Sequence, residues 1–578
     1  MAPTFRHRVG MGDPHAHYFT VELRVEGWSA DILPLQMPVW TPGSYLVREY
    51  SRHLQDFTAT SSSGIPLDWH KQAKQTWHVQ TAGVSQVQIR YRIYANELTV
   101  RTSHLDASHG YFNGACLFLY VPEYIDQSQR VTILPPQSDW RVTTALPLVA
   151  ESGNSFTYEA RSFHELVDSP FEIGTHQIIP FTVLGKPHTL AVWGKSNLDY
   201  NRYLPDLENL IKTEANLFGG LPYENYVFIV HFADGYGGLE HHNSTTLLYS
   251  RFELQPDEKY YKFLGLTAHE FFHLWNVKRI RPSTLDRFDY AQENYTRNLW
   301  FCEGTTSYYD ELFVFRAGIT DVRTYLKQVS EAITRLQTTP GRRVQLLEES
   351  SFDTWIKLYR PSENTPNTQI SYYLKGQLVS WLLDLHIRLE SAGQRSLDDV
   401  MRLLWVEFAS KGQSFPEEAL TSLIEKAAGC PLEDFFALTL RSNAELPYER
   451  YLRAFGLQLT VEYENRPYLG IRTQEKEGRT TLSVVEEGSP AHKAGLSAGD
   501  ELIALDGWKV AHSSLKERLS HLSAKTLVDI TVFRREELMT LGVRLGEPVA
   551  ERYHLSIRKD ANEQALARLQ SWLGKIEG

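Results

Sequence analysis

The first third of the chain alternates apolar and polar residues with a period of two. The segments "HYFTVELRV" (17–25) and "SQVQIRYRIYA" (85–95) show the alternation most clearly, and Pro and Gly punctuate the stretches between such segments. A period of two is typical of half-buried strands. The segment "MPVWTPGSYLVREY" (37–50) predicts a further strand followed by a Pro-Gly turn. We therefore expect an all-β N-terminal domain over residues 1–180.

From about residue 200 to 455 the pattern becomes helical. Apolar residues three and four apart recur in "NRYLPDLENLIKTEANLFGG" (201–220), "SYYLKGQLVSWLLDLHIRLESAG" (371–393) and "LDDVMRLLWVEFASKG" (397–412), and each segment closes at a Gly. This spacing and the terminal Gly indicate amphipathic helices. We expect an α-rich domain over residues 181–458.

The C-terminal part returns to short strands. Residues 459–548 read as strands and turns and predict a third domain, while 549–578 form a tail in which "DANEQALARLQSWLGK" predicts an amphipathic helix. Its expected apolar face comprises Leu566, Leu569, Trp572 and Leu573. The fold class expected for the whole chain is therefore multidomain α+β.

Charge and cysteine content narrow the function classes. The chain has 578 residues, a net charge of −11 and three cysteines, none in a CxxC pair. An acidic chain without a basic face is unlike a nucleic-acid binder, and sparse cysteines fit a reducing compartment. No apolar run approaches the length that spans a bilayer, and no signal peptide is visible. We expect a soluble cytoplasmic protein that binds neither nucleic acid nor membrane.

The segment "TAHEFFHLWN" (267–276) contains an HExxH motif. Residues four apart share one face of a helix, so His269 and His273 can direct ring nitrogens at one zinc ion. Glu270 can then serve as the base that takes a proton from water. The motif alone leaves open an ordinary buried helix with two satisfied histidines.

A third ligand is needed, and two downstream carboxylates can supply it. Glu303 lies in "NLWFCEGTTSYYDELF", where aromatic residues predict a buried helix that ends near Gly318. Glu293 lies in the more polar "AQENYT". A ligand on a fixed backbone is more precise, so we favour Glu303 and keep Glu293 as the rival.

These motifs together resemble the gluzincin aminopeptidases. "HEFFHLW" followed by "LWFCEGTTSYY" is similar to their HExxH and LWxxEGxxxY elements, and the resemblance implies that Glu303 is the third zinc ligand. The segment between the two motifs is longer here than in leukotriene-hydrolase-like members, which keeps Glu293 as an alternative.

Two further elements resemble substrate-binding parts of the same enzymes. "GYGGLEHH" is similar to the GxMEN element, which implies that Gly237 and Gly238 pair with the substrate backbone and that Glu240 binds its free α-amine. His241 and His242 follow on the same loop and are expected to lie outside the ligand set.

"YLKG" (373–376) is similar to the YxKG element, which implies that the hydroxyl of Tyr373 stabilises the oxyanion. The adjacent Tyr372 is an alternative.

Residues 466–510 resemble a PDZ domain, with "YLGI" as the carboxylate-binding loop. The resemblance implies that backbone N–H groups of Leu469, Gly470 and Ile471 bind the C-terminus of a peptide. The alternative is a domain that only packs on the catalytic body.

A β-rich N-terminal domain, a gluzincin core and a PDZ domain together resemble the glycyl aminopeptidase family. The family implies an aminopeptidase with one Zn²⁺ per chain that releases small N-terminal residues, Gly and Ala, from peptides with a free N-terminus. The rival functions are an endopeptidase or dipeptidase fed by the PDZ domain, and an inactive PDZ scaffold.

Overall fold

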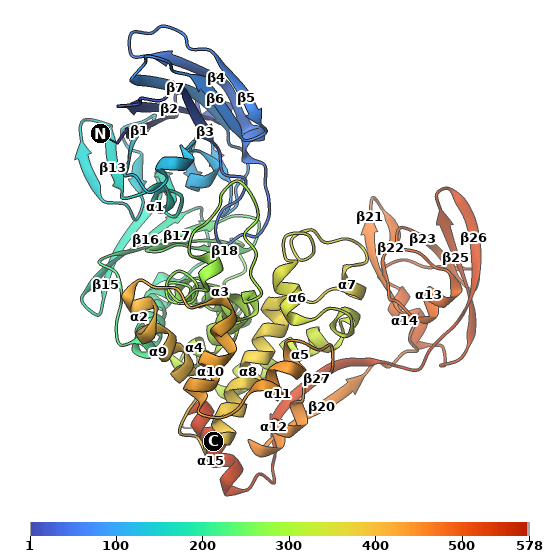
Figure 1. Cartoon of the computed structure of the whole chain (residues 1–578). Coiled ribbons are helices and arrows are strands. Elements are labelled where there is room, and N and C mark those ends of the chain that lie inside the picture. Colours follow the sequence, from blue (N-terminus) through green and yellow to red (C-terminus); the bar gives the residue numbers. More distant parts are fainter. Residues whose placement is uncertain (1, 575–578) are drawn as a thin grey trace. The chain divides into compact units, whose positions relative to one another are not determined.

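The computed structural model describes residues 2–574 (Figure 1). The chain divides into two compact units. The first comprises the residues up to 295 together with 312–319 and 402–416, and the second comprises 296–311, 320–401 and the residues from 417 onward.

The N-terminal part of the first unit is built from three β-sheets. The seven-stranded sheet runs in the order β12 (Leu148–Glu151), β13 (Phe156–Ala160), β10 (Gln129–Leu134), β1 (Thr4–Gly10), β2 (Tyr18–Glu26), β7 (Gln86–Tyr94), β4 (Leu54–Ser61). The three-stranded sheet is β3 (Ile32–Gln36), β6 (Thr76–Gln80), β5 (Trp69–Ala73), and the four-stranded sheet is β11 (Arg141–Thr143), β14 (Phe171–Gly174), β9 (His109–Phe112), β8 (Ser103–Leu105). The short helix α1 (Phe163–Val167) follows β13. The period of two in β2 buries Phe19, Val21, Leu23 and Val25, as the sequence predicted.

The predicted strand at the start of "MPVWTPGSYLVREY" is wrong. Strand β3 ends at Gln36, and the next residues leave the sheet because Pro38 and Pro42 cannot donate to a ladder. The N–H of Val39 instead donates to the carbonyl of Tyr290 at 2.8 Å. The Pro-Gly turn is present, and the N–H of Ser44 closes it on the carbonyl of Thr41.

A five-stranded sheet inside the expected α-rich region was not predicted. Its order is β15 (Gln177–Val183), β16 (Lys186–Trp193), β17 (Tyr226–Phe232), β19 (Ser244–Tyr249), β18 (Gly237–Glu240). Every residue of β17, "YVFIVHF", is buried, so this strand has no polar face and no period of two. Helices α2 (Tyr200–Phe218) and α3 (Asp257–Phe272) flank these strands in sequence, and α2 ends at Gly219 as predicted.

The second unit contains most of the later helices, together with the first parts of α4 (Thr305–Arg316) and α9 (Leu397–Glu407), whose last parts belong to the first unit. Its other helices outside the C-terminal β domain are α5 (Val322–Gln337), α6 (Leu347–Phe352), α7 (Thr365–Thr368), α8 (Tyr372–Glu390), α10 (Leu420–Ala428), α11 (Glu433–Thr439), α12 (Tyr448–Ala454) and α15 (Glu563–Leu573). Helix α8 is buried along most of its length and contacts α5, α6, α12 and α15. It ends at Glu390, three residues before the Gly that was expected to close it.

The predicted C-terminal β domain is inserted between two paired strands. Strands β20 (Leu457–Tyr463) and β27 (Ala550–Ile557) form an antiparallel ribbon (Figure 1). The chain between them forms a sheet of β21 (Ile471–Lys476), β22 (Arg479–Val485), β23 (Glu501–Leu505), β25 (Leu527–Arg534) and β26 (Glu537–Arg544), with β24 (Trp508–Lys509) and the helices α13 (Pro490–Ala494) and α14 (Leu515–Ser520). This domain has a hydrophobic core of its own.

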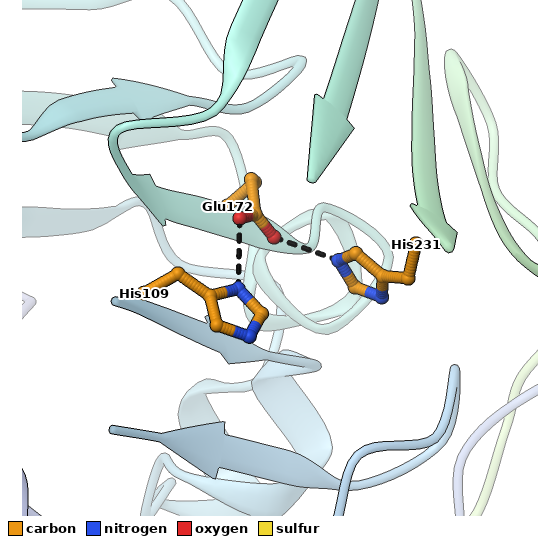
Figure 2. Close-up of side chains that lie close together, drawn as sticks. All are labelled: His109, Glu172 and His231. Atoms are coloured by element: carbon orange, nitrogen blue, oxygen red, sulfur yellow. Dashed lines mark hydrogen bonds and ion pairs between the residues drawn. The ribbon is translucent and has the colours of Figure 1, made fainter. Parts of the chain in front are cut away.

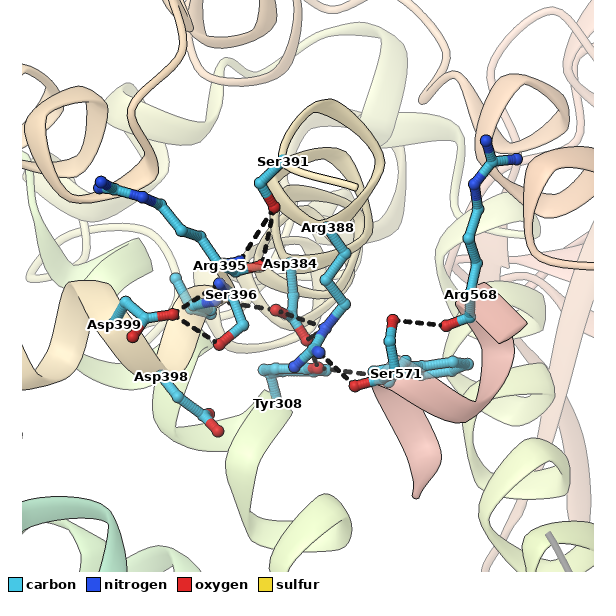
Figure 3. A network of polar contacts seen from close by, with 12 residues as sticks. Tyr308, Asp384, Arg388, Ser391, Arg395, Ser396, Asp398, Asp399, Arg568 and Ser571 are labelled. Atoms are coloured by element: carbon cyan, nitrogen blue, oxygen red, sulfur yellow. Dashed lines mark hydrogen bonds and ion pairs between the residues drawn. The ribbon is translucent and has the colours of Figure 1, made fainter. Parts of the chain in front are cut away.

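The terminal helix α15 is tied to α8 by a buried polar network (Figure 3). Trp572 donates its indole N–H to the hydroxyl of Tyr308 at 3.0 Å. Tyr308 in turn donates to Asp384 at 2.7 Å. Arg388 donates to both Asp384 and the carbonyl of Ser571. The predicted apolar face is correct for three residues, whereas Leu566 is exposed.

In the described part of the chain, none of the helices combines the length and the apolar character that crossing a membrane requires.

Candidate active site

The HExxH motif occupies the last turn of α3. The helix begins after Pro256 with two acidic residues, Asp257 and Glu258. Their negative charges interact favourably with the positive end of the helix dipole and stabilise the helix. His269 and His273 lie one turn apart at its other end, with ring centroids 4.6 Å apart and ring planes at 87°. The structure therefore brings both histidines to one face, as their spacing predicted.

The orientation of His273 suits a metal ligand. Its Nδ1 lies 2.6 Å from the carbonyl oxygen of Asn276, and since a carbonyl only accepts, Nδ1 carries the proton. The other nitrogen, Nε2, is then the one with a lone pair for a metal. Histidines that bind metals commonly donate their second ring N–H to such a carbonyl, which fixes tautomer and ring position.

Glu270 and Glu240 both lie beside His273 in the first unit. One ligand atom from each of the three residues lies within 4.8 Å of the others. Glu270 rests directly on Gly238 of β18, where a Cβ would come 2.1 Å from its Oε1. A side chain at position 238 would therefore displace Glu270, and Gly237 and Gly238 form part of the edge strand of the five-stranded sheet.

Two residues of the N-terminal domain contact this edge strand. Gly43, in the Pro-Gly turn, has φ +82°, and a Cβ there would lie 2.4 Å from a carboxylate oxygen of Glu240. Arg101 donates to the carbonyl of Gly238 at 3.0 Å. The turn thus forms a wall against the buried Glu240, which is only 4% exposed.

A buried ion-pair cluster holds the loop after β18. Asp168 contacts Nδ1 of His241 at 3.2 Å, the ammonium of Lys278 at 2.7 Å and the backbone N–H of His242 at 2.8 Å. Burial opposes ionisation of Asp168, but Lys278 and His241 hold its pKa below the usual range. His241 and His242 thus anchor the loop, and among residues 2–574 neither belongs to a group of side chains able to hold a metal ion.

Glu303 lies in the second unit, within a single π-helical turn, Trp300–Gly304, that precedes α4. It is 2% exposed. The turn packs closely on α8, because a Cβ on Gly304 would lie 2.5 Å from the Cα of Gly376. Single π-helical turns are frequent at functional sites.

Tyr372 and Tyr373 begin α8 in the same unit. The hydroxyl of Tyr372 accepts a hydrogen bond from Thr354 at 3.0 Å in the buried interior. The hydroxyl of Tyr373 lies 3.4 Å from that of Tyr359. Burial and then the carboxylate of Glu303 raise the pKa of Tyr373 well above its ordinary value, so the phenol stays protonated and able to donate.

The loop of Leu469, Gly470 and Ile471 opens on a cavity of about 1110 Å³. Gly470 has φ +82° and leaves no room for a side chain, since a Cβ would meet Ser489 at 2.2 Å. The inserted domain also packs on the helical part of its unit, where the Asn367 side chain bonds the carbonyl of Val485 and the N–H of Glu487. The cavity is lined from both sides, among others by Arg342, Arg343, Arg466 and His512.

Comparison with known families matches three segments. Residues 6–175 match the peptidase M61 N-terminal domain, 262–379 match M61 glycyl aminopeptidase and 467–545 match a PDZ domain. A crystal structure of an aminopeptidase N family protein from Idiomarina loihiensis superposes with a TM-score of 0.93 at 32% identity, covering 99% of this chain and 100% of that one. The chain belongs to the M61 glycyl aminopeptidase family. It is accordingly a metallo-aminopeptidase with an N-terminal β domain, a helical catalytic domain and a PDZ domain, as expected.

A second solved structure is more distant from this M61 aminopeptidase. An M1 zinc metallopeptidase from Deinococcus radiodurans has a TM-score of 0.48 at 13% identity, covering 77% of this chain and 94% of that one. No curated protein matches the chain.

Several residues at the site were not predicted from the sequence. Gly43 lies in the predicted Pro-Gly turn and Arg101 in the β-rich part of the chain, and only tertiary structure brings them to β18. Lys278 follows the HExxH motif by five residues. A cation so close in sequence to a predicted metal site could have been predicted to pair with a nearby carboxylate. Asp168 had no local signal.

Proposed function

We propose that the M61 aminopeptidase holds one zinc ion per chain through His269, His273 and Glu303. Two imidazoles and one carboxylate are the donor set of a catalytic zinc site that keeps a position open. The hydrogen bond from His273 to Asn276 supports this role, since it leaves Nε2 as the ligating nitrogen. Zinc bound there would supply the Lewis acidity that activates water and polarises the scissile carbonyl.

Glu303 is preferred to Glu293 as the third ligand. Glu303 is buried on a helical turn, whereas Glu293 is half-buried between elements. Within residues 2–574, none of the groups of side chains able to hold an ion includes Glu293. A buried carboxylate needs a cationic or hydrogen-bonding partner, which a metal ion supplies.

The protein groups have separate roles in the proposed reaction. Glu270 takes the proton of the attacking water and delivers it to the leaving amine. Tyr373 donates its hydroxyl to the developing oxyanion. Tyr372 is less suited because its side chain is wholly buried, with its hydroxyl beside Thr354 in the core. The edge strand of Gly237 and Gly238 pairs with the substrate backbone, as an edge strand of a sheet can.

The observation that carries the exopeptidase assignment is the position of Glu240. Its carboxylate lies beside Glu270 and His273 and against the Gly43 turn, where a substrate ammonium would pair with it. The enclosed position agrees with a preference for small N-terminal residues, Gly and Ala.

The test compares peptides with a free N-terminus and their N-acetylated forms. The free peptides are expected to be cleaved at least 100-fold faster, by kcat/KM, and Glu240→Gln should raise KM for the free form. Equal cleavage of both forms would instead indicate the rival endopeptidase. Metal analysis that found no zinc on the folded protein would support a PDZ scaffold.

The PDZ domain is proposed to bind the C-terminus of a peptide at the N–H groups of Leu469, Gly470 and Ile471. Support comes from the cavity at this loop and from β21, which is the edge strand of its sheet. Peptides with a free C-terminal carboxylate should bind, and their C-terminal amides should not. Equal binding of the two forms would leave the packing on Asn367 as the role of the domain.

A further inference from the structure

A second cluster of metal-binding side chains lies in the first unit and shares no residue with the proposed zinc site. It joins His109 of β9, Glu172 of β14 and His231 of β17 (Figure 2). Nδ1 of His109 lies 2.9 Å from Oε1 of Glu172, and Nε2 of His231 lies 2.8 Å from Oε2. All three side chains are completely buried, and one ligand atom from each lies within 4.8 Å of the others.

A fourth buried imidazole, which lies outside that group of three, faces the same carboxylate. His176 is buried, and its Nδ1 lies 3.9 Å from Oε1 of Glu172. Within the described part of the chain this Nδ1 has no hydrogen-bond partner. The other nitrogen, Nε2, is held by the hydroxyl of Thr143 at 2.7 Å. A polar partner on the far nitrogen is the usual support of a metal-binding histidine.

The carboxylate charge of Glu172 would be stabilised by a cation. Burial opposes ionisation of Glu172, but the imidazoles of His109 and His231 hold its pKa below the usual range, so it is a carboxylate. Burial lowers the pKa of His231 and of His176 and so favours the neutral form of each ring, while Glu172 acts in the opposite direction. Neutral imidazole and carboxylate are the protonation states that bind metals. A carboxylate buried beside imidazoles is costly unless a positive charge accompanies it, either a proton held by the rings or a metal ion.

The surrounding structure fixes the donors in place. His109 is stacked on Trp193 of β16, with ring centroids 3.7 Å apart and planes at 11°. Strands β9 and β14 are paired with His109 opposite Gly174, where a side chain would meet Cβ of His109 at 2.8 Å. Rigid placement of this kind is what a metal site requires.

We propose that His109, Glu172 and His231, with His176, bind a divalent transition metal of the zinc class. Glu172 would use both oxygens, one beside each ring, and the site would be closed because its side chains are buried. A closed site of imidazole and carboxylate is structural rather than catalytic. The ion would link the four-stranded sheet, which contains β9 and β14, to the five-stranded sheet, which contains β17.

The zinc content of the untagged full-length protein tests the proposal. After dialysis against a weak chelator, elemental analysis should find two zinc ions per chain in the wild type. The double variant His269→Ala/His273→Ala should retain one ion, since it loses only the proposed catalytic site. One ion in the wild type and none in the double variant would overturn the inference, and a shared proton would then supply the positive charge.

The two counts also separate this inference from the proposed function. One ion in both proteins would support the buried site and contradict the catalytic one, while no ion in either would contradict both. Glu172→Gln should lose one ion and lower the melting temperature. His7→Gln is the matched control, because His7 is equally buried, bonds Gln129 and lies outside the cluster. If Glu172→Gln fails to fold, the wild-type count still decides.

Discussion

At the residue scale, Glu270 separates metal binding from catalysis. Glu270→Gln keeps the size and the hydrogen-bonding capacity of the side chain, so the zinc content should not change. Loss of the base should lower kcat by about 10² to 10⁴-fold, the usual range for general-base catalysis. Turnover of a free-amine peptide and zinc content measured on the same preparation check this, and near-normal turnover would mean that another group is the base.

Gly43 is expected to control how well Glu240 is placed. The Cβ of Gly43→Ala would overlap the Glu240 carboxylate, so KM for free-amine peptides should rise about 10-fold, equivalent to about 1.4 kcal/mol. Gly64→Ala is the control, because Gly64 has nearly the same φ, +83°, but no atom within 4 Å of a Cβ. Both variants carry the same backbone strain. An equal KM for the two would show that the turn does not position Glu240.

At the element scale, the π-helical turn depends on close packing against α8. Gly304→Ala would press on the backbone of Gly376 and should destabilise the fold by about 1–3 kcal/mol. Gly265→Ala, inside α3 with open space around it, should stabilise by about 0.5–1 kcal/mol. Denaturant midpoints of the two variants should therefore move in opposite directions. If Gly304→Ala were instead more stable than the wild type, the contact between Gly304 and Gly376 would have room for a methyl group.

Lys375 of α8 makes stability depend on pH. It is 2% exposed, and burial lowers its pKa to about 8. The unfolded state, with the ordinary lysine value, therefore binds more protons between about pH 8 and 10.5, so the free energy of unfolding should rise with pH across that window. Lys375→Met should remove the rise and be more stable at pH 7, by at most roughly 3 kcal/mol.

Unfolding by denaturant at pH 7, 8.5 and 10 measures this effect. Lys262→Met is the control, since Lys262 is exposed on α3 and should retain the wild-type slope. A wild-type protein with a flat or falling profile over this window would show that the ammonium is solvated in the fold.

The sequence predicts an element or a site when its pattern lies within one short segment, and fails when the feature depends on contacts between distant segments. The strand β2 and helix α2 follow from periodicity and a terminal Gly, and both are present. Strand β17 was missed because a strand buried on both faces has no alternation. The HExxH helix was found because its histidines are four residues apart, whereas the Gly43 contact with Glu240 joins segments about 200 residues apart, and no local pattern encodes it.

At the scale of the whole molecule, the thiols report the integrity of the fold. Cys116 and Cys302 are buried and Cys430 is half-buried, and none of the three is in a disulfide. Burial raises the pKa of the Cys430 thiol and raises that of Cys116 to about 12, so both react slowly. A thiol reagent should modify at most one cysteine in the native protein and three in denaturant. Cys430→Ser should leave no thiol that reacts in the native protein, and two rapidly reacting thiols in the native wild type would contradict the fold.

The cytoplasmic location expected from the sequence stays a prediction.

The way in which the PDZ domain enters the chain has a consequence for how such proteins can be built. Its two ends leave from adjacent positions of the β20–β27 ribbon, where the N–H of Glu464 donates to the carbonyl of Val549 at 2.9 Å. A few residues could bridge that gap and close the ribbon as a hairpin. The PDZ domain could therefore be deleted, or replaced by another peptide-binding domain, without interrupting any strand of the remaining protein. Such an exchange could occur in evolution or be made by protein engineering.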